Sequence, residues 1–308
     1  MLIFKITLFS LAFLFTFSFF FSHDVHAQES PQEYDIGISL VNIGEIDKII
    51  GNYEMDFWYS VSSDNSDLIE NPPPEVDFIN GRILETRSEF KDPTIIEKRL
   101  LGKFSSEMDF RDFPFEKIPL QIKIEPLPQW PTAKVKLTVN NASGIDKSAT
   151  VPGWKIVESS FKIIENKYGE NTYSQFVAEY VIQRDILGSF LKTIFPILII
   201  LGISFIAYAI PKNYDIVTEL SLLPLLALVF FHISTLDLLP PLGYMTIFDK
   251  LMIISYVLIM NNILSAGRQI RAHEFSGTDR ALYMNNLHFK ITPIIIGVLV
   301  VLLFFVIL

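Results

Sequence analysis

The sequence contains no cysteine in its 308 residues, which excludes disulfide bonds, thiolate metal ligands and cysteine nucleophiles. Residues 28–184 also lack histidine, and the sequence has no G-x-S-x-G, H-E-x-x-H or phosphate-binding glycine motif. Carboxylates are numerous, but their spacing distinguishes no catalytic or metal-binding group. The sequence therefore predicts that the protein is not an enzyme and holds no cofactor and no metal.

Positive charge is scarce in the same region. Residues 28–184 carry 17 Lys and Arg against 26 Asp and Glu, which is a net charge of −9. Such acidity disfavours nucleic acid as a partner and raises the local concentration of cations.

The first 27 residues have the features of an export signal. A single lysine, Lys5, is followed by a Phe- and Leu-rich run and by the small-residue site Val25-His26-Ala27. This pattern predicts a secretory signal peptide, residues 1–27, that is cleaved before Gln28. A retained anchor is the alternative, because the apolar stretch Ile6–Phe21 is close to the lower length limit for crossing a bilayer.

Residues 28–184 are predicted to form an extracellular all-β domain, an immunoglobulin-like sandwich. Short β-rich runs are separated by turn residues, and Lys134–Val139 alternates polar with apolar side chains. Residues 166–171 predict a hairpin turn between the last two strands. The expected strands are 35–43, 51–61, 81–90, 95–104, 120–124, 133–139, 154–165 and 172–184.

After Arg184 the sequence predicts an all-α transmembrane domain, residues 185–308, with four apolar runs that could each cross about 30 Å of hydrocarbon. Lys and Arg occur between the first and second runs and between the third and fourth, but none occurs in residues 237–244. The sequence thus predicts a multi-pass protein of the cell membrane. The positive-inside rule then places its all-β domain (the β-domain) and its C-terminus outside the cell. The four runs are 187–210, 216–236, 245–266 and 291–308.

The second run carries acids on one helical face. A carboxylate at the bilayer centre costs about 2.5 to 3.5 kcal/mol, so these acids are expected to face water or a partner. Repeated around a symmetric ring, the face would line a cation pore with carboxylate rings and a hydrophobic constriction. Its members recur every three or four residues: Asp215, Glu219, Leu223, Leu226, Phe230, Ile233 and Asp237.

An inert four-helix anchor is a different interpretation of the same face. Asp215 and Asp237 would then lie in the headgroup layers, where acids at helix ends are common. Glu219 favours the pore, because it lies one full turn inside the apolar run.

Four short features occur in order along the chain. Phe113-Pro114-Phe115-Glu116 is an aromatic-proline-aromatic-acid corner, and Arg184 precedes the first apolar run. Pro196 lies inside that run, and Leu239–Tyr244 joins the second run to the third. With these features the chain after residue 27 resembles the prokaryotic pentameric ligand-gated ion channels, which are related to the animal Cys-loop receptors.

The resemblance implies a homopentamer in the lipid bilayer that conducts monovalent cations through an axial pore. The second membrane helix of each subunit would line this pore, and its carboxylate rings would favour cations over anions. Asp215 would lie at the cytoplasmic mouth, Glu219 at the narrow inner ring and Asp237 at the outer ring. The hydrophobic gate would be formed by Leu226, Phe230 and Ile233.

The resemblance also implies that the β-domain controls the pore where the two domains meet. Glu116 would pair with Arg184 there, and the link between the second and third helices would receive the movement. An exposed ion pair without a gating role is the other interpretation. The implied gating residues are Asp47, Phe113, Pro114, Phe115, Glu116, Arg184, Pro240 and Tyr244.

Agonists of this family bind between subunits under the last hairpin, often with a cation held over aromatic faces. Tyr168 and Tyr173 flank that hairpin, so the resemblance makes them candidates for binding an unknown small-molecule agonist. Protons are the other candidate stimulus, given the acidic β-domain.

Two residues of the second helix depart from a simple pore helix. Pro224 deletes a backbone hydrogen bond and is expected to kink the helix unless its neighbours compensate. His232 lies off the acidic face, so packing against another helix is expected ahead of proton sensing. A non-conducting membrane receptor or scaffold of the same fold remains the alternative function, and Glu219 is the residue that distinguishes the two.

Overall fold

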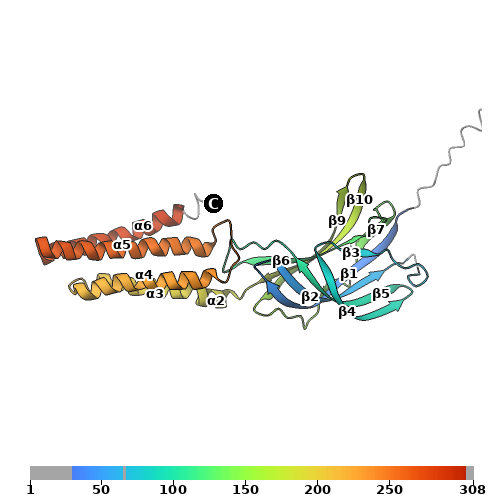
Figure 1. The fold of residues 1–308 in the computed structure, drawn as a ribbon, viewed down its shortest axis with the longest axis horizontal. Coiled ribbons are helices and arrows are strands. Elements are labelled where there is room, and N and C mark those ends of the chain that lie inside the picture. The colour runs from blue at the N-terminus through green and yellow to red at the C-terminus, as the bar shows by residue number, and fades with distance from the viewer. Residues whose placement is uncertain (1–29, 65–66, 303–308) are drawn as a thin grey trace, which may run out of the picture.

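The structure is a computed structural model that describes residues 30–64 and 67–302. It consists of a β-rich part, here called the β-domain (residues 30–184), and a bundle of long helices at one end of it (Figure 1). The predicted signal peptide lies outside the described residues. In the described residues the strands are β1 Gln32–Asp47, β2 Asn52–Ser62, β3 Val76–Phe78, β4 Gly81–Asp92, β5 Ile95–Ser105, β6 Lys117–Pro126, β7 Val135–Val139, β8 Gly144–Ile145, β9 Lys155–Tyr168 and β10 Asn171–Gln183.

The strands form two sheets. One has the order β4-β5-β2-β1-β7, with β8 also paired to β1, and the other has the order β3-β6-β10-β9. Each of the eight expected strands corresponds to one of these, whereas the three-residue β3 and the two-residue β8 were not expected. Such short strands leave too few residues for a visible alternation.

The two sheets share one hydrophobic core. Ile38 and Phe57 from the first sheet and Ile122 and Phe176 from the second are all 0% exposed and belong to one cluster. The hydroxyl of Tyr53 on β2 donates to the backbone oxygen of Gln121 on β6 at 2.7 Å, which ties the sheets together. The core and this hydrogen bond hold the β-domain without any disulfide.

The predicted hairpin turn is present between β9 and β10. Tyr168 pairs with Asn171, so only Gly169 and Glu170 make the turn. Gly169 has φ of +62°, as a two-residue turn with glycine at its first central position requires.

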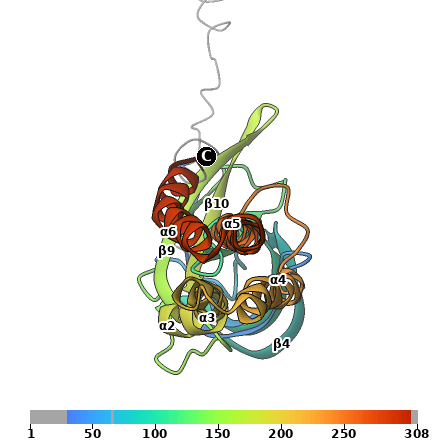
Figure 2. The ribbon, with the colours of Figure 1, turned by 90° about the vertical axis from the view of Figure 1, so that its left-hand side faces the viewer.

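In the part of the chain that the structure describes, four helical segments are long and apolar enough to cross a membrane, which supports a multi-pass membrane protein. The first, Ile186–Ala209, is composed of α2 Ile186–Ser189, the π-helical η1 Phe190–Ile194, α3 Phe195–Ile206 and the short η2 Ala207–Ala209. The others are α4 Tyr214–Leu236, α5 Ile247–Ser276 and α6 Thr278–Val301. In Figure 2, which looks along the bundle, α4 and α6 lie on different sides of α5.

The π-helical turn in the first segment has a local cause. The amide of Phe195 bonds to the oxygen of Phe190, five residues earlier instead of four. Pro196 follows directly, and its ring would clash with the carbonyl of a regular preceding turn. A widened turn relieves this clash, and such turns often accompany irregular positions in helices.

The bounds of the last two helices differ from the expected apolar runs. Helix α5 continues ten residues beyond Ala266, and α6 begins thirteen residues before Ile291. Residues 267–290 therefore form a helical hairpin and not a loop. Their sequence is too polar to be recognised as part of a membrane span, so hydropathy misses it.

Buried polar side chains join this hairpin and the adjoining turns of the bundle. Asn285 on α6 donates to the backbone oxygen of Tyr208 and accepts from Gln269, both at 3.1 Å. Asn261 donates to Thr292 at 3.0 Å, and Tyr208 donates to Asn262 at 2.8 Å. Hydrogen bonds between helices hold membrane bundles together where the hydrophobic effect gives no preference between protein and lipid.

Candidate pore helix and its contacts with the β-domain

The seven residues of the acidic face of α4 all point away from the helices of their own chain. The exposed fractions of Leu223 and Phe230 are 62% each, and those of Leu226 and Ile233 are 55% each. The three acids of the face, Asp215, Glu219 and Asp237, are exposed as well. The single chain thus presents one continuous open face, acidic at both ends and apolar between them.

The opposite face of α4 is buried against the chain's own bundle. Val217, Ser221, Pro224 and Leu228 are buried there. Helix α4 remains one helix from Tyr214 to Leu236 despite the proline. Pro224 therefore faces the bundle interior, away from the open face. Its missing N–H leaves the residues of the open face in one continuous helix.

His232 packs against α5, as expected from its position off the acidic face. Its Nδ1 lies 3.0 Å from the hydroxyl of Tyr256, and its ring centroid lies 5.8 Å from that of Phe248. Its Nε2 is buried without a hydrogen-bond partner among the described residues. The histidine is thus a contact between the candidate pore helix and the first three turns of α5.

The expected pair of Glu116 and Arg184 is formed where the β-domain meets the first membrane helix. Arg184 Nε donates to Glu116 Oε1 at 2.9 Å. The Glu116 side chain is 0% exposed and that of Arg184 is 29% exposed, so this is not a solvent-exposed pair. The guanidinium also lies over the ring of Trp154, 4.5 Å from its centroid.

Lys48 is a contact that the sequence did not reveal. Its Nζ donates to the backbone oxygen of Leu238 at 3.1 Å, which joins the β1–β2 turn to the link between α4 and α5. Burial lowers the pKa of Lys48, the charge of Arg184 lowers it further, and the charge of Glu116 opposes both. Lys48 therefore lies within electrostatic reach of the buried pair and touches the end of the candidate pore helix.

Asp47, which the resemblance places at this junction, caps the turn that follows β1. Its carboxylate accepts the backbone N–H groups of Ile49 and Ile50, at 2.9 and 3.3 Å. It thus shapes the turn that carries Lys48, in the manner common for aspartate in turns. The only available signal for Lys48 was its place in the same turn, next to Asp47.

The motif Phe113-Pro114-Phe115 lies against the start of α5. The first N–H groups of a helix have no partner within the helix. The backbone oxygen of Phe113 accepts the N–H of Phe248 at 3.2 Å, and that of Arg111 accepts the N–H of Ile247 at 2.9 Å. The rings of Phe113 and Phe248 meet edge to face with centroids 5.9 Å apart. Backbone oxygens of this loop therefore cap the third membrane segment.

The other expected gating residues lie in the same region. Phe115 accepts a hydrogen bond from Gln183 through its backbone oxygen at 3.3 Å. The hydroxyl of Tyr244 accepts the backbone N–H of Phe110 at 2.9 Å. Pro240 is half-buried in the α4–α5 link. The structure thus gathers residues from four distant parts of the chain at one junction.

Tyr168 and Tyr173 lie side by side at the β9–β10 hairpin, with ring centroids 5.9 Å apart. Tyr168 is 54% exposed, whereas Tyr173 is 8% exposed and donates to the backbone oxygen of Pro128. The structure adds Glu125, which the sequence could not distinguish from the other acids. Its buried Oε1 accepts hydrogen bonds from Tyr168 at 3.3 Å and from Gln175 at 2.6 Å. Two aromatic rings and one carboxylate at the same place are suited to a cation.

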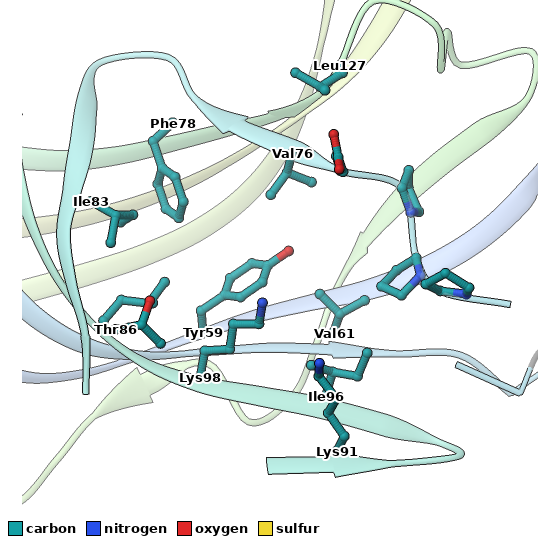
Figure 3. Close-up of a pocket in the computed structure, with 15 residues that line it drawn as sticks. Tyr59, Val61, Val76, Phe78, Ile83, Thr86, Lys91, Ile96, Lys98 and Leu127 are labelled. Atoms are coloured by element: carbon teal, nitrogen blue, oxygen red, sulfur yellow. The ribbon is translucent and has the colours of Figure 1, made fainter. Parts of the chain in front are cut away.

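A separate cavity of about 480 Å³ lies between β2, β4 and β5 of the first sheet and β3 with the chain before it (Figure 3). Its walls are apolar, with Val61, Phe78 and Ile96 among the lining residues. Lys91 and Lys98 also line it, and both form an ion pair with the single carboxylate of Glu89. Glu75 lines the cavity as well, so Glu75 and Glu89 balance the two lysines and no excess of negative charge favours a cation there.

Among residues 30–64 and 67–302, no group of three or more His, Asp or Glu side chains is arranged to hold a metal ion. Comparison with protein families finds no family model that matches the chain. Comparison with curated proteins finds no match either.

Proposed function

We propose that the chain forms a homopentameric membrane channel that conducts monovalent cations, with α4 of each subunit lining the pore. The observation that carries this proposal is the open face of α4. It is acidic at both ends, apolar between, and unused by the helices of its own chain. Five copies around an axis would convert it into carboxylate rings on either side of a hydrophobic constriction.

In this proposal the β-domain is an extracellular immunoglobulin-like sandwich that follows a cleaved signal peptide. The chain path supports a β-domain and a C-terminus on the same side of the membrane, because the described end of α6 lies at the same end of the bundle as the β-domain (Figure 1). The acidic β-domain would concentrate cations at the pore mouth.

Movement of the β-domain would reach the pore by two contacts in this proposal. The first is the Lys48 hydrogen bond to Leu238, directly after the end of α4. The second is the loop of Phe113, which caps α5 beside the ring of Phe248. The Glu116–Arg184 pair would fix the relative position of both contacts, because it joins the loop of Phe113 to the start of the first membrane helix.

The proposed stimulus is a small organic cation bound by Tyr168, Tyr173 and Glu125. Support comes from the paired rings and from the carboxylate of Glu125, which accepts a hydrogen bond from Tyr168. Protons are the competing stimulus, since five copies of an acidic domain would surround the pore mouth.

Current through the purified protein in a planar bilayer with a KCl gradient tests the proposal. Reversal near the K⁺ equilibrium potential is expected, and a step of the outer solution from neutral to acidic pH separates protons from another agonist. Current that reverses near the Cl⁻ potential would contradict the proposal. Silence in both conditions from a verified pentamer would exclude gating by protons and leave two interpretations, a channel that needs its organic cation or a non-conducting receptor.

A further inference from the structure

The hairpin of α5 and α6 projects beyond the apolar part of both helices. The ten residues of α5 after Ala266 add about 15 Å at 1.5 Å per residue. The headgroup layer of a bilayer is only about 5 to 8 Å thick on each side. In Figure 1 this hairpin lies at the end of the bundle farthest from the β-domain. Its side chains therefore pass through the layer in which lipid phosphates lie.

A hollow of about 400 Å³ lies on this hairpin. Three of its lining residues are arginines, and no acid is among them. We call it the arginine hollow and define it by Arg268, Arg271, Ala272, Phe275, Ser276, Arg280 and Met284.

No direct ion pair within 4.0 Å is seen for the three arginines among the described residues. Arg268 instead lies 3.1 Å from His288 Nε2, and Arg280 lies over the ring of Tyr283. Three positive groups thus converge on one hollow in a chain whose net charge is −9. An anion in the hollow would remove their mutual repulsion.

The chemistry of the hollow selects the kind of anion. The planar guanidinium group matches the geometry of phosphate oxygens and donates two hydrogen bonds at once. Phe275 is 79% exposed beside the arginines, and Met284 lines the same hollow. Arginines next to apolar side chains suit an amphiphile with a phosphate head more than a fully hydrated ion.

We propose that the arginine hollow binds the headgroup phosphate of an anionic phospholipid. Basic clusters directly beyond a membrane helix attract anionic lipids. Because the hairpin extends about 15 Å beyond the apolar part of α5, this cluster lies at the level of the lipid phosphates. The inference depends on the four membrane helices and not on ion conduction, so it stands whether or not the protein is a channel.

Native mass spectrometry of the full chain in nonionic micelles tests the proposal, with short-chain phosphatidylglycerol, short-chain phosphatidylcholine and inorganic phosphate as separate probes. Phosphatidylglycerol should bind at least about tenfold more tightly than phosphatidylcholine, because the choline cation offsets the phosphate charge; tenfold is the scale of one charge-assisted hydrogen bond. An excess of inorganic phosphate should not displace it. Equal binding of the two lipids would overturn the proposal, and displacement by inorganic phosphate would assign the hollow to free anions.

Matched variants separate the hollow from general positive charge. Arg271→Gln should weaken phosphatidylglycerol binding by about tenfold or more, whereas Arg271→Lys should weaken it less, because it keeps the charge but not the planar fork. Lys212→Gln removes one charge from the α3–α4 link and should change binding by about fivefold at most. Equal losses in Arg271→Gln and Lys212→Gln would refute a specific site. Arg280→Gln repeats the test on α6 if Arg271→Gln reduces the yield of folded protein.

Discussion

Replacement of Arg184 by glutamine gives the most direct test of the junction between the domains. Glu116 is 0% exposed, and its Oε1 would lose a partner at 2.9 Å, while its buried Oε2 has none among the described residues. Breaking a buried ion pair from one side costs about 3 to 5 kcal/mol. Arg184 is partly exposed and Lys48 stays nearby, so we expect a smaller loss of unfolding free energy, about 2 to 3 kcal/mol.

The double substitution isolates the pair from its surroundings. Glu116→Gln removes the buried charge and leaves Arg184 hydrated at its exposed edge, so we expect a loss of about 1 to 2 kcal/mol. Glu116→Gln with Arg184→Gln should then be less destabilised than the sum of the single variants, by about 1 to 2 kcal/mol.

Urea unfolding of the full chain in micelles, followed by tryptophan emission, measures these losses. All three tryptophans, Trp58, Trp130 and Trp154, lie in the β-domain, so the signal reports that domain. Lys136→Gln is the control, because its pair with Glu33 is about half exposed on both sides and is worth about 0 to 1 kcal/mol. A loss for Arg184→Gln no larger than this control, or strictly additive single losses, would refute the reasoning.

Three further predictions follow from the same structure. Glu219→Gln should leave the oligomer intact and lower the ratio of cation to anion permeability severalfold in bilayer recordings, whereas an unchanged ratio would argue against its place in the pore. Burial raises the pKa of Tyr59 and Tyr180 far above the usual value near 10. The unfolded chain then loses these phenol protons first, so stability should persist below a pH of about 10 and fall above it, and Tyr59→Phe should make the fall less steep in urea unfolding at stepped pH. Asn285→Leu should cost about 1 to 2 kcal/mol and lower the melting temperature in micelles, because it breaks two buried hydrogen bonds between helices, while exposed Asn286→Leu should not.

Several elements follow from the sequence because they depend on local periodicity. Alternation within the expected strand 120–124 set the buried face of β6, where Leu120, Ile122 and Ile124 are all 0% exposed. Gly169 marked the turn of the last hairpin, because few other residues accept its positive φ. The three- and four-residue steps from Asp215 to Asp237 defined one face of α4, since a helix repeats every 3.6 residues.

Contacts between distant segments needed the tertiary structure. Lys48 meets Leu238 across 190 residues, and nothing in the local pattern of either segment indicates the other. Glu125 became distinct from the other acids only when folding buried it beside Tyr168. The polar start of α6 is helical because Asn285 finds partners on η2 and α5, and a hydropathy profile does not register such partners.

The sequence by itself thus determined which residues share a face within one strand or helix, because the geometry of each element repeats along the chain. It also determined the four apolar segments, because bilayer thickness sets a minimum length for each. Only the tertiary structure decided which loop meets which helix, that the face of α4 is left open, and that Arg268, Arg271 and Arg280 surround one hollow. These relations depend on how side chains far apart in sequence fill the same space, and no periodicity along the chain records that.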